Sequence, residues 1–325
     1  MFLLGLQGSP RLKGNTNTLL NTFTEEAKHM GVDTRIIHVT EKNIEPCKEY
    51  IVCEKKGYCP IEDDMARELY PLLRRADIVV AATPIFFYNC TAQLKAVIDR
   101  CQTLWARKYK LKLKDPGSET RRGYLLAVGA TSGKNLFEGL NLTASYFFDA
   151  IDASFEGSLT YRGIEHRKDM EKHPTMREDV QHAVEKLLQP LMERKKILFL
   201  CHDSSCYSQI AGAYAQKLFG KRFDVSCAGI QPLESTHPLL EPVMREDGID
   251  MAFRIPQSLE SASISGPPDW LVTLGESKIE PNLPHVVPMH WKLPAYADKP
   301  IDFVRKLRDD IKQRVMQFIG NITPG

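Results

Sequence analysis

Short apolar runs alternate with amphipathic helical segments along the first two-thirds of the chain. This alternation is typical of repeated βαβ units around a mainly parallel sheet. Five runs are expected to be strands, namely Phe2–Gln7, Asp33–His38, Asp77–Ala82, Tyr124–Gly129 and Ala153–Leu159. The first helix places Leu19, Leu20, Phe23 and Ala27 at helical spacing on one buried face. The pattern predicts an α/β fold with a doubly wound parallel sheet.

The pattern changes near residue 190. We expect a helix over Thr175–Leu188, and the next stretch, Gln189–Lys196, carries a proline and a cluster of charges. A new strand begins at Ile197, so we predict two domains, residues 1–190 and residues 196–325. In the second, the expected strands are Ile197–Leu200, Phe223–Cys227, Trp270–Leu274 and His285–Met289, and the expected helices are Ser208–Phe219, Pro238–Asp247 and Ile301–Ile319. This is a second, smaller α/β domain.

Composition narrows the class of protein. The 325 residues are 43% hydrophobic and 26% charged, which is close to globular averages. A net charge of +2 gives no field that favours nucleic acid or an anionic membrane. No apolar run approaches the ~18 residues of a membrane span, and the N-terminus does not read as a signal peptide. We therefore expect a cytoplasmic protein without nucleic-acid or membrane partners.

The first strand ends in a loop of small and hydroxyl-bearing residues that leads into the first helix. The free N–H groups of a helix N-terminus, the hydroxyls of Ser9, Thr16 and Thr18 and the guanidinium of Arg11 can together bind a phosphate. Taken alone, this loop fits an ordinary strand-to-helix turn with an N-cap equally well.

Two more loops follow neighbouring strands. Residues 83–91 carry the aromatic side chains of Phe86, Phe87 and Tyr88, and residues 129–135 include Thr131, Ser132 and Gly133 with their backbone donors. Ligands of open parallel sheets bind at the carboxyl ends of strands near the switch point, where these loops should converge. They are predicted to bind a phosphate and a flat ring, although an aromatic loop by itself is more often packing.

Several motifs together resemble the NADPH-dependent FMN reductase family over about residues 1–190. They are Gly-Ser-Pro-Arg at 8–11, Gly-Asn-Thr at 14–16, Thr-Pro-Ile-Phe-Phe at 83–87 and Gln-Leu-Lys-Ala at 93–96. The resemblance implies a flavodoxin-like fold, FMN as cofactor, NAD(P)H as electron donor and a small-molecule acceptor. It implies a phosphate site at Ser9, Arg11, Asn15, Thr16 and Asn17, and an isoalloxazine ring along Pro84, Ile85, Phe86, Phe87, Tyr88 and Asn89. Relatives also imply a homodimer.

A cysteine-bearing segment follows the second strand. Cys47, Cys53 and Cys59 are separated by five residues each, and the segment resembles that of iron–sulfur flavoproteins. Those relatives have a compact four-cysteine pattern, and Tyr50 occupies the position of the cysteine that would complete this pattern here. Three thiolates leave one iron of a cubane cluster open, so a cluster, simple packing and a dimer contact all remain possible. We assign no metal ligand here.

The second domain begins with a strand and a loop from Cys201 to Gln209. Together with Ser-Cys-Ala-Gly at 226–229, His237 and Asp269, this loop resembles the low-molecular-weight phosphatase and arsenate reductase family over about residues 196–320. The resemblance implies a nucleophilic cysteine beneath an oxyanion that backbone N–H groups and one arginine bind. A nest of N–H groups is expected to lower the pKa of Cys201.

Three departures from that family alter the expected chemistry. Tyr207 replaces the arginine, Ser204 replaces an asparagine, and residues 290–296 offer no carboxylate as general acid. Bidentate recognition of an oxyanion is lost, which disfavours phosphatase and arsenate reductase turnover. Cys201 and Cys206 remain as candidate catalytic thiols that form a reversible disulfide or hold a thiol-bound substrate, unless they are packed separately.

Two functions compete. The leading hypothesis is an FMN-dependent NAD(P)H oxidoreductase that passes electrons to a flavin, quinone, metal or metalloid, or thiol acceptor, with a degenerate phosphatase-like second domain. The alternative is a redox-sensing protein whose second domain recognises an anion or a partner.

Overall fold

The computed structural model describes residues 1–262, 266–281, 283 and 286–322. The chain divides into two compact units. The first unit consists of Met1–Lys112 and Thr120–Met192, and the second of Leu113–Glu119 and Glu193–Gly325. The short segment Leu113–Glu119 therefore belongs to the second unit, although it lies within the sequence range expected for the first domain.

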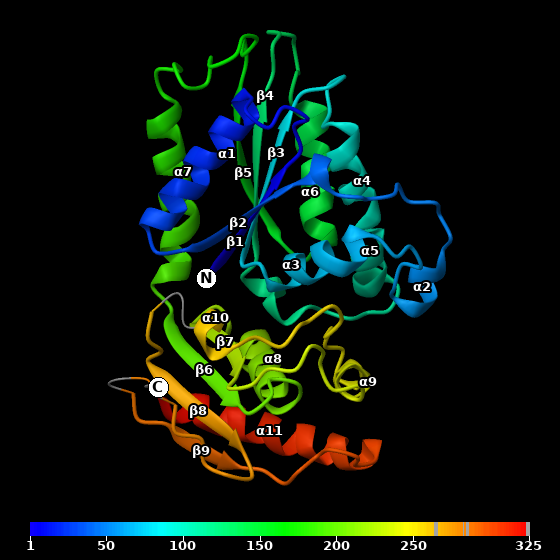
Figure 1. The fold of residues 1–325 in the computed structure, drawn as a ribbon, viewed down its shortest axis with the longest axis vertical. Helices are drawn as coiled ribbons and strands as arrows, with labels where there is room; N and C mark the ends of the chain where they lie inside the picture. Colours follow the sequence, from blue (N-terminus) through cyan, green and yellow to red (C-terminus); the bar gives the residue numbers. More distant parts are fainter. Residues whose placement is uncertain (263–265, 282, 284–285, 323–325) are drawn as a thin grey trace. The chain divides into compact units, whose positions relative to one another are not determined.

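The first unit contains a five-stranded parallel sheet in the order β2-β1-β3-β4-β5 (Figure 1). Its strands are β1 (Phe2–Gln7), β2 (Asp33–His38), β3 (Ile78–Pro84), β4 (Arg122–Val128) and β5 (Ser154–Tyr161). The chain adds β2 on one side of β1 and β3 on the other, so the switch point lies between β1 and β3. The doubly wound, flavodoxin-like sheet is confirmed.

Helices cover both faces of this sheet. They are α1 (Asn15–His29), α2 (Val52–Lys56), α3 (Tyr70–Arg75), α4 (Ala92–Arg100), α5 (Gln102–Tyr109), α6 (Glu138–Ala150) and α7 (Met176–Met192), with short turns η1 (Val39–Glu41) and η2 (Met65–Leu69). Figure 1 shows α1 and α7 on one face and α3 to α6 on the other. The predicted stripe of α1, Leu19, Leu20, Phe23 and Ala27, is fully buried against β-strand residues.

Helix α7 runs beyond its expected end. The sequence predicted an end at Leu188 because Pro190 follows, yet the helix continues to Met192 with the proline inside its last turn. Leu187, Leu188 and Leu191 are all buried in the core of the first unit. Burying Leu191 offsets the one backbone hydrogen bond that a proline removes.

The second unit has a four-stranded parallel sheet in the order β7-β6-β8-β9. Its strands are β6 (Lys195–Cys201), β7 (Phe223–Gly229), β8 (Trp270–Gly275) and β9 (Met289–Lys292). Its helices are α8 (Tyr207–Phe219), α9 (Leu240–Glu246), α10 (Leu259–Ala262), α11 (Ile301–Ile322) and the short η3 (Pro116–Glu119). The expected strand His285–Met289 is wrong in position, since the strand begins at Met289, and His285 lies outside the described residues.

The two faces of this second sheet are covered unequally. On one face, side chains of α8, α9 and α11 build the larger core. On the other, Leu198, Leu200, Ala228 and Leu271 form a small cluster beneath α10 and the loops around it. Ile197 belongs to the first of these cores and Leu198 to the second, as the alternation of a strand requires.

The segment Leu113–Glu119 is joined to this unit by backbone pairing. The N–H of Lys114 donates to the Gly248 carbonyl at 3.0 Å, and the N–H of Asp250 donates to the Lys114 carbonyl at 2.9 Å. Arg254 approaches the carboxylate of Asp115 at 3.6 Å. These contacts link positions far apart in sequence, which explains why a local pattern did not predict them.

Candidate functional site

The loop after β1 forms the first part of the candidate flavin site. The Ser9 hydroxyl accepts the N–H of Arg11 at 3.2 Å, and the N–H of Gly14 donates to the Arg11 carbonyl at 3.0 Å. The Arg11 side chain is exposed, whereas Ser9 and Thr16 are buried. Gly14 is the N-cap residue of α1 and no side chain caps this end. The first turn of α1 thus offers its N–H groups to a ligand.

Asn15 has a structural contact that the sequence did not indicate. Its amide donates to the His166 carbonyl at 2.8 Å, and its oxygen accepts the N–H of Met170 at 3.2 Å. These bonds tie the first loop to the segment after β5. One amide hydrogen of Asn15 is left for a ligand.

Two amide side chains beside this loop have unsatisfied buried atoms. Gln7, the last residue of β1, is fully buried; its oxygen accepts the N–H of Ser9, and its Nε2 has no partner among the described residues. The Oδ1 of Asn17 is likewise buried without a partner there. A buried polar atom without a partner costs about 1–3 kcal/mol, so both point to a missing polar ligand. Asn17 was predicted; Gln7 was missed, and its polar character at the end of an apolar strand was the available signal.

The loop after β3 contacts the first loop directly. Thr91, the N-cap of α4, donates its hydroxyl to the Gly8 carbonyl at 2.6 Å, and the N–H of Gly8 donates to the Ala82 carbonyl at 2.8 Å. A Cβ at Gly8 would lie only 2.8 Å from the Cβ of Leu94, so glycine is required for this approach. The structure therefore brings the first two predicted loops together at the switch point.

The aromatic loop is a tight, strained hairpin. Phe86 and Asn89 exchange both backbone hydrogen bonds, and the two residues between them, Phe87 and Tyr88, have φ of 48° and 62°. Positive φ at both central residues makes a turn that favours glycine or asparagine rather than aromatics. Phe87 is fully exposed and Phe86 and Tyr88 are about half exposed. Strain of about 1–3 kcal/mol per residue at exposed aromatics is a mark of a functional loop.

The loop after β4 approaches the same hairpin. A Cβ at Gly133 would lie 2.8 Å from the Tyr88 hydroxyl oxygen, which places Thr131, Ser132 and Gly133 beside the aromatic side chain. Arg162, which follows β5, donates to the Gly133 carbonyl at 2.8 Å and to the Ser132 carbonyl at 3.4 Å. Arg162 is a second residue that sequence reasoning missed. All three predicted loops thus meet, while the individual ligand contacts stay predictions.

Two buried arginines hold the cysteine-bearing segment. Arg100 of α4 donates to the Asp63 carboxylate at 2.5 Å and to the Glu45 carbonyl at 2.9 Å, and Arg107 of α5 donates to the Gly57 carbonyl at 3.0 Å. Cys47 is exposed, and Cys53 and Cys59 are partly buried. Among the described residues, no three histidine, cysteine or acidic side chains are arranged to hold a metal. Burial raises the pKa of the Cys53 thiol, with added contributions from the Cys59 and Cys47 thiols.

The cysteine loop of the second unit lies between β6 and α8. Cys201 ends β6, and its Sγ accepts the N–H of Ser204 at 3.2 Å and lies 3.2 Å from the Ser208 hydroxyl. Ser204 adopts a positive φ of 55° to make this turn. Cys201 and Cys206 are both fully buried. The predicted nest around Cys201 is present in part.

The expected low pKa of Cys201 is wrong. Burial raises the pKa of this thiol above its usual value, and the Asp203 carboxylate adds to the rise. The hydroxyl and N–H of Ser208 and the N–H of Ser204 lower it, but less. Burial also raises the pKa of Cys206. At neutral pH both groups are therefore thiols, and their role as catalytic residues is a prediction that this burial disfavours.

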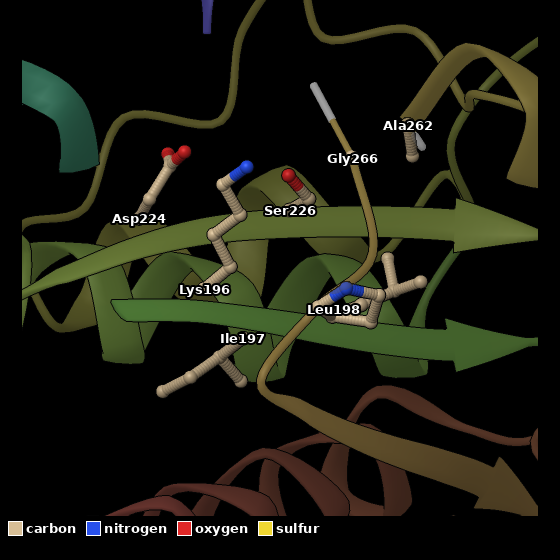
Figure 2. Close-up of a pocket in the computed structure, with 8 residues that line it drawn as sticks. Lys196, Ile197, Leu198, Asp224, Ser226, Ala262 and Gly266 are labelled. Atoms are coloured by element: carbon tan, nitrogen blue, oxygen red, sulfur yellow. The ribbon is translucent and has the colours of Figure 1, made fainter. Parts of the chain in front are cut away.

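A small hollow lies on the thinly covered face of the second sheet. Its lining includes Lys196, Leu198, Asp224, Ser226 and Ala262, and its volume is about 20 Å³. Figure 2 shows Lys196, Asp224 and Ser226 on this side of the strands and Ile197 on the other. The space admits about one water molecule and no cofactor. Lys196 stands at the start of β6 and Cys201 at its end, so the hollow is separate from the cysteine loop.

Comparison with known proteins gives a different relative for each part of the chain. Residues 1–141 match the family described as NADPH-dependent FMN reductase, and residues 196–322 match the family described as low molecular weight phosphotyrosine protein phosphatase. An iron-sulfur flavoprotein of Methanosarcina thermophila is 35% identical over 114 residues, which are 35% of this chain and 59% of that protein. The match thus spans little more than half of that relative.

The second part matches its relatives over almost their whole length. An arsenate reductase of Brevibacillus brevis is 34% identical over 131 residues, which are 39% of this chain and 96% of that protein. A solved arsenate reductase in the phosphate binding state is 26% identical with a TM-score of 0.35, covering 40% of this chain and 99% of that one. In the part of the chain that the structure describes, no helix is both long and apolar enough to span a bilayer.

Proposed function

Because the chain joins a region of the NADPH-dependent FMN reductase family to a member of the low molecular weight phosphotyrosine protein phosphatase family, we propose that it is an FMN-dependent NAD(P)H oxidoreductase. When bound, FMN supplies the redox chemistry by accepting a hydride from a nicotinamide and passing electrons to an acceptor. The protein contributes binding, orientation and the exclusion of side reactions.

The uncapped first turn of α1 beside unsatisfied buried amides is the observation that carries this proposal. The Nε2 of Gln7 and the Oδ1 of Asn17 both lack partners among the described residues, and the α1 N-terminus has no side-chain cap. N–H groups at a helix N-terminus together with hydroxyls fit a phosphate monoester. Ser9, Thr16 and the Nδ2 of Asn17 would hold it, with Arg11 as the cation, whereas the Oδ1 of Asn17 only accepts and would take a donor group of the ligand other than the phosphate.

The aromatic hairpin and the loop after β4 would border the flavin ring. Phe86, Phe87 and Tyr88 expose aromatic surface beside the backbone of residues 131–133, which offers polar groups to a ring edge. Arg162 uses its guanidinium to hold the carbonyls of Ser132 and Gly133, so it positions this loop.

The electron acceptor that we propose is a small molecule reaching the flavin: a flavin, a quinone, or a metal or metalloid species. A thiol acceptor at Cys201 or Cys206 is the weaker choice, because both side chains are fully buried and the pKa of each is raised. Hydride acceptance by the flavin of the first unit and recognition of an anion by the second unit can be tested in separate experiments.

Flavin extraction tests the phosphate assignment. We expect acid-released flavin to be FMN rather than FAD, because the single helix N-terminus of α1 fits the one phosphate group of a flavin monophosphate. Arg11→Ala should lose flavin during gel filtration, because a charge-assisted contact contributes about 1.5–3 kcal/mol. Lys13→Ala is the matched control, since Lys13 is an exposed cation of the same loop. Recovery of FAD, or equal flavin retention in the two variants, would contradict the assignment.

A further inference from the structure

The anion-type loop of the second unit contains a carboxylate of its own. Asp203 follows Cys201 by two residues, and its Oδ1 accepts the N–H of Ser205 at 2.9 Å. The same oxygen lies 3.8 Å from the Cys201 Sγ. N–H groups in a strand-to-helix loop are the donors that bind oxyanions. A negative group therefore already lies beside the thiol and uses one of these donors.

Tyr296 holds the other carboxylate oxygen. Its hydroxyl donates to the Asp203 Oδ2 at 2.6 Å and lies 2.7 Å from the Ser205 hydroxyl. A tyrosine has one hydroxyl proton, so Ser205 donates to the Tyr296 oxygen while Tyr296 donates to Asp203. Tyr296 is only 8% exposed, and both oxygens of Asp203 have a donor. The carboxylate is fixed rather than free to swing away.

Tyr207 supports this arrangement from the position where the relatives are expected to carry arginine. Its ring meets the Tyr296 ring edge-on, with centroids 4.6 Å apart, and its hydroxyl donates to the Pro294 carbonyl at 2.7 Å. The His237 ring also meets the Tyr296 ring edge-on, with centroids 5.2 Å apart, and the backbone N–H of His237 donates to the Ser205 carbonyl. The residue that would have supplied a cation instead positions the residue that binds Asp203.

Within the part of the chain that the structure describes, no cation pairs with the Asp203 carboxylate. Among the described residues, the donors to Asp203 are the Cys201 thiol, the Ser205 N–H and the Tyr296 hydroxyl, all of them neutral. An entering oxyanion would meet a like charge and one fewer N–H group. Like charges brought together without compensation strongly oppose binding.

We propose that Asp203 is a built-in anion that closes the Cys201 loop to phosphate, arsenate and other tetrahedral oxyanions, with Tyr296 as its positioning residue. Asp203 thereby determines the specificity of the second unit by excluding the ligands that the loop shape would otherwise admit. The proposal is independent of whether the first unit reduces flavin.

Phosphate titration of the full chain by calorimetry is the first test. The natural protein should show no binding in the millimolar range and Tyr207→Arg only weak binding, since a new arginine would pair with Asp203. Combining Tyr207→Arg with Asp203→Gly should tighten phosphate binding ~10-fold or more over Tyr207→Arg alone. Equal affinity of Tyr207→Arg and the double variant, phosphate binding by the natural protein, or a folded double variant that binds none would each overturn the proposal.

A second test measures alkylation of Cys201 and uses a substitution that changes side-chain packing little. The ratio of Cys201 alkylation rates with anionic iodoacetate and neutral iodoacetamide reports the local charge, because burial and thiol ionisation affect both reagents alike. Asp203→Asn, which is nearly isosteric, should raise this ratio several-fold. Asp298→Asn is the control, since Asp298 is exposed and asparagine tolerates its φ of 57°. An unchanged ratio in Asp203→Asn, or an equal rise in the control, would contradict the proposal.

Discussion

Cys201 illustrates how single side chains change a site that its motif predicts. The strand-to-helix loop does supply N–H groups to the thiol, from Ser204 and Ser208, as the motif indicated. Burial nevertheless outweighs them and raises the pKa of Cys201. The Asp203 carboxylate that adds to this rise is held by Tyr296, which is 93 positions away from Asp203. A local motif cannot report such a contact, so the loop was predictable and its chemistry was not.

The buried pair of Asp63 and Arg100 gives a pH-dependent prediction. Burial by itself would raise the pKa of Asp63, but the hydrogen bond from Arg100, the N–H of Glu45 and the Arg100 charge outweigh it and hold the pKa below its usual value. A carboxyl whose folded pKa is depressed stabilises the fold above its unfolded pKa of about 3.9, and this contribution is lost as pH falls through the folded value.

Asp63→Asn should therefore lower the free energy of unfolding at neutral pH by about 3–5 kcal/mol, because it leaves the buried Arg100 uncompensated. Below about pH 4, the free energy of unfolding of this variant should also fall less steeply with pH than that of the natural protein. Urea unfolding at several pH values provides the measurement. Asp99→Asn is the control, since Asp99 pairs with Lys95 at the surface, where a pair contributes under ~1 kcal/mol. Equal effects of the two variants would refute this role of Asp63.

At the scale of elements, the hairpin after β3 combines strain with exposure. Phe87→Asn should stabilise the protein by about 0.5–1 kcal/mol, since asparagine tolerates the left-handed region and Phe87 buries no surface. Flavin retention should fall in the same variant if the aromatic ring borders the flavin. Phe86→Asn is the matched control, because Phe86 is exposed without a positive φ. A lower melting temperature for Phe87→Asn than for the natural protein would contradict the strain argument.

Apolar periodicity predicted most elements of both sheets. Phe2–Gln7 and Asp33–His38 match their strands end to end, and Trp270–Leu274 misses its strand by one residue. The errors have tertiary causes. Helix α7 includes Pro190 because Leu191 is buried, β9 is displaced toward Lys292, and Leu113–Glu119 pairs with a distant segment. The positive φ values of the hairpin also had no sequence signal, since aromatic residues rarely adopt them.

At the scale of the whole molecule, the chain carries two parallel-sheet units whose loops after the first strand differ in their capacity to bind a ligand. The first keeps an open helix N-terminus and unsatisfied amides at its switch point. In the second, the corresponding loop is occupied by its own carboxylate. We therefore expect ligand-dependent chemistry in the first unit. Homodimer formation stays a prediction, and exposed Leu142 and Tyr146 on α6 are candidates for its contact surface.

An anaerobic titration of the purified full chain with NADPH and NADH tests the central claim most directly. The account predicts a yellow protein whose flavin absorbance bleaches on addition of at least one of the two nucleotides and returns when a quinone or free flavin is added. Repeated turnover with such an acceptor would distinguish an oxidoreductase from a redox sensor. A purified protein that binds no FMN when FMN is supplied, or whose bound FMN is not reduced by either nucleotide, would contradict the account.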